Sequence, residues 1–158
     1  MGRDRTQGGL NWSTYKWCNG SETTFTKYCT NSSYGTVDNK TELDPEDDAA
    51  YVNWGPSWRM PTMDQLQELT NKCTWNWTTQ NGVNGLLITG PNGNSMFLPA
   101  GGRIEGSSMK AVMTCGYYWG QMLSGQGTAI DLECISAYPI PVCYERCTGL
   151  NVRAVRVQ

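Results

Sequence analysis

Histidine is absent from the 158 residues of the chain, and this absence excludes the commonest catalytic arrangements. Without histidine there is no Ser-His-Asp or Cys-His nucleophile and no mixed Cys/His zinc site. The sequence also lacks a P-loop and a Gly-x-Gly-x-x-Gly turn after a strand. A pair of carboxylates could still hydrolyse glycosides, but 14 acidic residues make some such pair inevitable. We therefore expect no enzymatic activity and no cofactor.

Long apolar runs and an excess of one charge are also lacking. No stretch approaches the ~20 apolar residues that cross a bilayer, so we expect no direct membrane insertion. The 12 basic and 14 acidic residues give a formal net charge of -2, so we expect no nucleic-acid partner. The polar start MGRDRTQGG is not a signal peptide, which leaves a cytoplasmic protein or a fragment of a larger one.

Cysteine, tryptophan and tyrosine are what the chain has instead. It contains 7 Cys, 7 Trp and 8 Tyr, against only 2 Phe. The odd number of cysteines leaves at least one unpaired within the chain, and their irregular spacing disfavours an all-cysteine metal site. Tryptophan and tyrosine combine an apolar body with a polar tip, which suits binding faces, although small domains also use them as core filler. The length fits one domain, residues 1–158.

The helix signals fall in the middle of the chain. In LDPEDDAAYVNWG, Asp44 can cap a helix that starts at Pro45 and ends before Gly55. The acidic residues there favour the helix dipole, and without a calcium-loop spacing we interpret them as cap and first turn. PTMDQLQELTNKC predicts a second helix, with a capping box of Thr62 and Gln65. Its apolar residues form a core-facing stripe that extends to Cys73 at the end of this phrase.

Strand signals follow the second helix. GLLITGPNGNSMFLP predicts a hairpin, while GYYWG, TAIDLECIS and LNVRAVRV predict further strands. CISAYPIPVCYERC, from Cys134 to Cys147, contains two prolines, so we expect a loop there. Residues 10–43 predict irregular structure. Helices followed by strands indicate an α+β fold with an antiparallel sheet.

Several phrases occur in an order that resembles a known family. LDPEDDAAYVNWGPSWRMPTMDQLQEL, NGNSMFLPA, GYYW and NVRAV together resemble the Fibrobacter succinogenes major paralogous domain over about residues 10–158. The phrase from Trp58 to Thr62 is its most specific mark. This resemblance implies a C-type lectin-like fold with small antiparallel sheets, two helices and long surface loops. The family's usual N-terminal segment is replaced here by MGRDRTQGG, so we expect the C-terminal part of a larger surface protein.

Departures from the family pattern define a candidate variable region, about residues 101–151. Scaffold positions such as Leu132, Ser136 and Arg146 are kept, while Asn- and Tyr-like positions between them are replaced without insertions. Adenine-directed mutagenesis by a diversity-generating retroelement would leave this pattern; ordinary drift is the alternative. The predicted ligand-binding set is Arg103, Ile104, Glu105, Lys110, Cys115, Tyr118, Gly120, Gln121, Ile130, Asp131, Glu133, Ile135, Tyr138, Ile140, Val142, Cys143, Tyr144, Glu145, Cys147 and Thr148.

These observations lead us to expect a ligand-binding, adhesin-like module at the cell surface, or on a virion tail, whose partner is a protein or cell-surface structure. A pilus, a surface lipoprotein or a phage tail fibre could carry it. No calcium-lectin phrase is present, so we expect binding without metal. Two alternatives stay open: a formylglycine-generating type of enzyme, with Cys143 and Cys147 as its reactive pair, and a purely structural surface domain.

Overall fold

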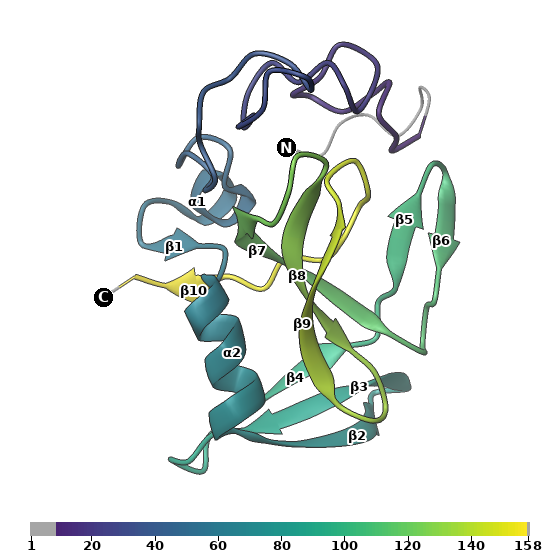
Figure 1. Ribbon diagram of the computed structural model, residues 1–158. Helices are drawn as coiled ribbons and strands as arrows, with labels where there is room; N and C mark the ends of the chain where they lie inside the picture. The colour runs from purple at the N-terminus through teal and green to yellow at the C-terminus, as the bar shows by residue number, and fades with distance from the viewer. Residues whose placement is uncertain (1–8, 158) are drawn as a thin grey trace.

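The protein is described by a computed structural model for residues 9–157, and the predicted polar N-terminus lies largely outside these residues. The fold is α+β, with two helices and small, mostly antiparallel sheets, as the sequence predicts (Figure 1). The elements are α1 (Ala49–Trp54), β1 (Trp58–Arg59), α2 (Met63–Lys72), β2 (Thr74–Gln80), β3 (Val83–Thr89), β4 (Ser95–Pro99), β5 (Arg103–Glu105), β6 (Ser108–Lys110), β7 (Gly116–Leu123), β8 (Thr128–Cys134), β9 (Pro139–Glu145) and β10 (Val155–Arg156).

Helix α1 starts later than the sequence predicts. Its N-cap is Asp48, whose Oδ1 accepts hydrogen bonds from the backbone N–H of Ala50 at 2.8 Å and of Tyr51 at 3.2 Å. The other oxygen, Oδ2, accepts from Met60 N at 2.9 Å, which ties the helix start to the chain that follows it. The prediction of Asp44 as the cap was wrong because the residues between Asp44 and Asp48 form a turn.

Helix α2 has the predicted capping box. The Thr62 hydroxyl accepts from Gln65 N at 3.2 Å, and Gln65 Oε1 accepts from Thr62 N at 3.0 Å. Leu66 is buried in the core, while Leu69 and Cys73 are partly buried and pack against it. Cys73 thus faces the core, although it is less buried than the stripe predicts.

The core lies between α2 and two three-stranded sheets, β2-β3-β4 and β7-β8-β9. Its buried side chains come from all three layers: Leu66 from α2, Leu86 and Ile88 from β3, and Tyr118 and Leu132 from β7 and β8. The hairpin of β3 and β4 was predicted, whereas β2 and the β5–β6 hairpin were not. In the predicted C-terminal strand, Val155–Arg156 pairs with β1, and Asn151 forms an isolated parallel bridge with Tyr118 of β7.

The segment expected to be a loop between Cys134 and Cys147 contains the strand β9. It pairs antiparallel with β8 from Pro139 to Glu145 and forms the edge of its sheet. Proline lacks the N–H that a central strand must donate, but an edge strand can turn that position away from the ladder. The loop prediction was wrong because it considered only a central strand, which the prolines exclude. It did not consider an edge strand, which tolerates them.

The N-terminal part of the chain, residues 9–48, is irregular, as predicted for residues 10–43. Figure 1 shows it arching over one end of the β7-β8-β9 sheet. It contains isolated bridges rather than strands, including Phe25 with Gly35 and Glu42 with Met122. Among residues 9–157, no helix has the length and apolar character needed to span a membrane.

Candidate functional site

Part of the predicted ligand-binding set lies in the protein interior. Tyr118 belongs to the core cluster, and its hydroxyl donates to Pro99 O at 2.6 Å. A side chain at Gly120 would meet Leu66 Cδ1 and Pro61 O, each 3.2 Å from the added Cβ. The alternation of β7 turns Tyr118 and Gly120 towards the core, so these members of the set are not accessible to a ligand at the surface. The buried members are Cys115, Tyr118, Gly120, Asp131, Cys147 and Thr148.

The strand register gathers other members of the set on one side of the β7-β8-β9 sheet. Opposite Glu133 lie Tyr117 on β7 and Ile140 on β9, and opposite Asp131 lie Trp119 and Val142. Because residues directly opposite each other share a face, these side chains point away from the core cluster. We call this side the outer sheet face; it consists of Tyr117, Trp119, Asp131, Glu133, Ile140, Val142 and Tyr144.

A charged and aromatic network joins the β5–β6 hairpin to the outer sheet face. Arg103 Nε donates to Glu105 Oε1 at 2.6 Å, and Arg103 Nη1 donates to the Tyr117 hydroxyl at 2.6 Å. The Tyr144 hydroxyl donates to Glu105 Oε1 at 2.8 Å. The Arg103 guanidinium also lies 4.9 Å and 5.0 Å from the ring centroids of Tyr117 and Tyr144. The structure thus brings Arg103, Glu105 and Tyr144 of the predicted set into direct contact.

These contacts shift the ionisation of the network. Hydrogen bonds from Arg103 and Tyr144 lower the pKa of Glu105 below its usual value. Burial raises the pKa of Tyr144 to about 12, and its hydrogen bond to Glu105 acts in the same direction. At neutral pH, Glu105 is therefore ionised, and Tyr144 is a neutral donor. Both states preserve the network.

Asp131 is the most deeply buried residue of the outer sheet face, where Tyr117 is also buried. It is 0% exposed, and neither of its carboxylate oxygens has a hydrogen-bond partner among the described residues. Burial and the neighbouring charge of Glu133 raise its pKa to about 7, while Arg103 acts to lower it. A carboxyl group in this position gains and loses its proton near neutral pH.

Two buried thiols of the predicted set, Cys115 and Cys147, are held in their protonated form. Burial raises the pKa of Cys115 to about 11, with the nearby Tyr117 and Glu133 as smaller influences, and Cys115 Sγ donates to Glu133 Oε1 at 3.5 Å. Burial and Glu145 raise the pKa of Cys147 to about 11. Since a nucleophilic cysteine reacts as its thiolate, neither environment activates the sulfur. Cys143 is exposed on β9 and belongs to the opposite side of the sheet.

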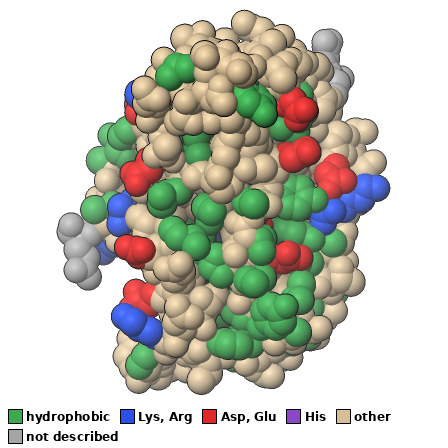
Figure 2. Space-filling model, in the orientation of Figure 1, with side chains coloured by type: hydrophobic (Ala, Val, Ile, Leu, Met, Phe, Trp, Pro, Cys, Tyr) green, Lys and Arg blue, Asp and Glu red, His purple; other side chains and the backbone are tan. Residues whose placement is uncertain are grey.

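A groove of about 670 Å³ opens where the β8–β9 turn meets α2 and the start of β2. The large hydrophobic side chains exposed there are Trp75 (39%), Tyr138 (46%) and Ile140 (38%), and Trp75 Nε1 donates to Ala137 O at 3.3 Å. Figure 2 shows hydrophobic side chains gathered on the lower half of this face, over β9 and the sheet below it. The groove is lined by Met63, Gln67, Thr70, Asn71, Trp75, Ala137, Tyr138, Pro139, Ile140 and Pro141.

The groove includes Tyr138 and Ile140 of the predicted set, but its α2 and β2 residues were missed. They lie outside residues 101–151, the candidate variable region, so comparison with the pattern of the resembled family could not find them. The signal available in the sequence was TWNW, in which tryptophans alternate with polar residues. Such alternation is typical of a half-exposed strand that displays aromatic rings.

The remaining members of the predicted set are dispersed. Lys110 is exposed on β6 opposite Arg103, and Ile104 pairs with Gly149. Gln121 Nε2 lies 3.4 Å from Glu42 Oε2, beside the N-terminal segment. Others point to the core side of the sheet or lie in the turn after β8: Ile130, Ile135, Cys143 and Glu145.

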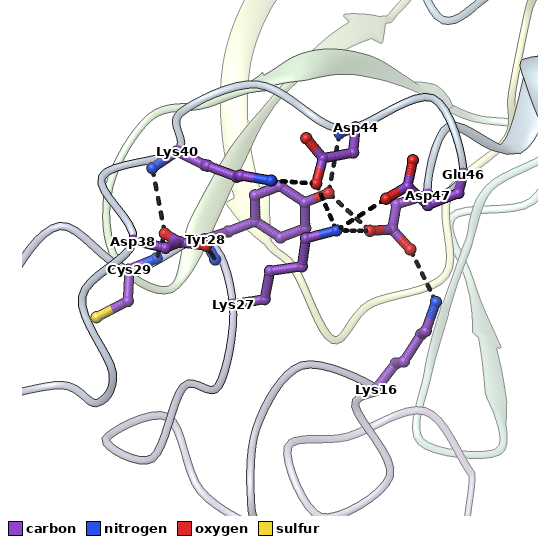
Figure 3. Close-up of polar contacts among 9 residues, drawn as sticks. All are labelled: Lys16, Lys27, Tyr28, Cys29, Asp38, Lys40, Asp44, Glu46 and Asp47. Atoms are coloured by element: carbon purple, nitrogen blue, oxygen red, sulfur yellow. Dashed lines mark hydrogen bonds and ion pairs between the residues drawn. The ribbon is translucent and has the colours of Figure 1, made fainter.

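The acidic cluster near α1 is occupied by lysine ammonium groups (Figure 3). Carboxylate oxygens of Asp44, Glu46 and Asp47 lie within 4.8 Å of one another. Lys27 Nζ lies 2.5 Å from Asp44 Oδ2 and 2.6 Å from Asp47 Oδ2. Lys16 Nζ binds the second oxygen of Asp47 at 2.7 Å. The cluster therefore joins parts of the N-terminal segment through ion pairs.

Comparison with protein-family models, with curated proteins and with solved structures finds no match to this chain.

Proposed function

We propose that the chain is a ligand-binding, adhesin-like module with a C-type lectin-like fold, which binds a protein or cell-surface structure without catalysis. The observation that carries this proposal is the exposure of Tyr138 and Ile140, which are 46% and 38% accessible at one end of the edge strand β9. Exposed aromatic and apolar side chains clustered on one face are typical of interaction surfaces. The outer sheet face and the groove form one candidate surface, joined at Ile140.

The backbone beneath this surface supports the proposal. β9 pairs with β8 along seven residues, and β8 pairs in turn with β7. A rigid sheet can present aromatic side chains with little loss of conformational entropy on binding, as paratope tyrosines do. The same ladder can hold its shape while outward-facing side chains change. This suits a face that presents different side chains in different copies of the gene.

Binding to intact surfaces tests the proposal. Purified protein is applied to a panel of host cells and bacterial cells, and the variants Tyr138→Ala and Ile140→Ala are compared with it. We expect each to weaken binding by about tenfold, since truncating a central contact typically costs ~1–2 kcal/mol. Val157→Ala is the matched control, because Val157 is 43% exposed near β10, outside the candidate surface. Circular dichroism and thermal melting verify that the variants fold.

Two results of this experiment would contradict the proposal. If the β9 variants unfold, the exposed residues serve the structure, which favours a purely structural domain. If they fold and bind like the parent, the surface lies elsewhere. The enzyme alternative finds less support, because the pKa of Cys147 is raised and Cys143 lies on the opposite side of the sheet from the outer sheet face.

We further propose that retroelement-directed mutagenesis diversifies part of residues 101–151 on a cell surface, with a virion tail as the alternative. Buried positions such as Asp131 and Tyr118 tolerate few side chains, so the diversified set is narrower than the family pattern suggests. The coding DNA tests this directly. It should contain a near-copy of the 3′ end that differs almost only at adenines, beside a reverse transcriptase gene. Without such a copy, drift explains the pattern.

A further inference from the structure

The groove beside β9 has no charged residue in its lining. Its α2 side is formed by Met63, Gln67, Thr70 and Asn71. The charged residues Glu68 and Lys72 lie outside the lining and pair with each other at 3.1 Å. A ligand with a formal charge would therefore lose hydration in the groove without gaining an opposite charge. The groove suits an uncharged ligand.

Two exposed aromatic rings flank the groove from different elements. Trp75 comes from β2 and Tyr138 from the β8–β9 turn, and both line the opening. The hydrogen bond from Trp75 Nε1 to Ala137 O links these two sides and restricts the indole. Aromatic faces carry negative charge density, so they attract flat ligand faces with weakly positive C–H groups. A pyranose ring presents such faces.

The hydrogen-bonding groups of the groove narrow the ligand class further. The side-chain amides of Gln67 and Asn71 have no partner among residues 9–157, and each offers both donors and an acceptor. Pro139 and Pro141 have no N–H, so the adjoining edge of β9 offers carbonyl acceptors with few backbone donors. A peptide strand would find a poor partner for backbone pairing there. Sugar hydroxyls can both donate and accept.

A proline-rich peptide is the nearest competitor, because such peptides also bind aromatic-lined grooves. It has carbonyl acceptors and needs donors from the groove. The indole N–H of Trp75 is already used by Ala137 O, so the amide N–H groups of Gln67 and Asn71 are among the donors left for such a peptide. The carbonyl groups at the edge of β9 and the amide oxygens would stay unpaired with it, whereas sugar hydroxyls can pair with both donors and acceptors.

We propose that this groove binds a neutral glycan chain, with sugar rings stacked on Trp75 and Tyr138 and hydroxyls bound to the Gln67 and Asn71 amides. The inference rests on the proposed function, since it names the ligand class of one end of the same surface. It requires no metal ion, because the lining contains no carboxylate.

Direct titration with defined oligosaccharides tests the inference. Neutral tetramers of N-acetylglucosamine, glucose, mannose and galactose are compared with sialylated and sulfated oligosaccharides and with a proline-rich peptide, each with and without EDTA. We expect at least one neutral tetramer to bind, unaffected by EDTA. We expect Trp75→Ala to weaken it by about tenfold and Gln67→Ala by several-fold. Gln67 is exposed on α2, so its truncation leaves the fold intact.

The matched control is Trp54→Ala, because Trp54 is 55% exposed on α1 and does not line the groove. It should leave glycan affinity unchanged. Binding of charged oligosaccharides or of the peptide alone, or of no neutral tetramer, would overturn the inference, as would equal effects of the two tryptophan variants. If the Tyr138→Ala and Ile140→Ala variants still lose cell binding in that event, the proposed function stands and only the ligand class fails.

Discussion

The N-terminal segment, residues 9–48, and the β7-β8-β9 sheet hold their backbones in different ways. In the segment, side chains add to scattered backbone hydrogen bonds: the two carboxylate oxygens of Asp38 accept from the N–H groups of Tyr28 and Cys29, at 2.8 Å and 2.9 Å. In the sheet, backbone binds backbone along the β7–β8 and β8–β9 ladders. A shape fixed by side chains constrains their identity, whereas a shape fixed by a ladder leaves the outward side chains free to vary.

This difference locates where a variable surface can exist on this chain. Replacing Asp38 would leave buried N–H groups of Tyr28 and Cys29 without partners, which is costly. Replacing Ile140 removes no backbone contact, because the strand pairs through its own N–H and C=O groups. The irregular segment, which looks like a region free to vary, is thus the more constrained of the two.

Arg146 joins the two regions, and its truncation should have the largest effect. It follows β9, and its Nη1 donates to Tyr28 O at 2.9 Å, while the guanidinium lies 4.1 Å from the Phe25 ring centroid. Arg146→Ala removes this bond and leaves a cavity, so we expect about 4 kcal/mol less stability. Chemical denaturation measures the change, and hydrogen exchange should show the loss first in the N-terminal segment.

Arg146→Met distinguishes the two contributions of this side chain. Within residues 9–157, Nε and Nη2 of Arg146 have no hydrogen-bond partner, and burial lowers the pKa of the guanidinium. Methionine keeps the packing against Phe25 and removes the poorly satisfied charge, so it should cost clearly less than alanine. Equal losses for both variants would mean that charge rather than packing joins the regions.

Much of the fold could be predicted from local signals. The capping box of Thr62 and Gln65 and the turn between β3 and β4 involve residues close in sequence, and both are present. The predictions failed where pairing with residues distant in sequence determines the secondary structure. Pro139 and Pro141 are compatible with a strand only because β9 has a neighbour on one side, which no local pattern reveals. β2 depends in the same way on its partner β3.

The candidate site was predictable only in part, for a related reason. The altered positions of the family pattern led to Tyr138 and Ile140, which are exposed, and equally to Asp131, which is buried. A one-residue change of register exchanges the two faces of a strand, so exposure requires the pairing itself. Trp75 and Gln67 come from elements that precede the altered region, and only the fold brings them to Tyr138.

Asp131 offers a more specific test of this comparison, and this test concerns the β7-β8-β9 sheet alone. Its pKa rises from 3.8 to about 7 on folding, so the folded state binds the proton more tightly than the unfolded chain does. Stability should therefore fall as pH rises from about 4 to 7, by about 4 kcal/mol at most, and stay level above that. Asp131→Asn should remove this slope and be the more stable protein at pH 8.

Denaturation across pH 3–9 separates this effect from the other carboxylates. Asp44, Asp47 and Glu105 have lowered pKa values, so the stability they contribute is present above about pH 4 and is lost as pH falls below it. Asp64→Asn is the matched control, because Asp64 is exposed in the first turn of α2. A parent protein equally stable at pH 4 and pH 8 would contradict the burial of a charged Asp131. The same slope in the Asn variant would assign it to another group. If stability is independent of pH between 4 and 8 only in the Asn variant, then Asp131 destabilises the sheet at neutral pH. The sheet tolerates this side chain because its shape is maintained by the backbone ladder.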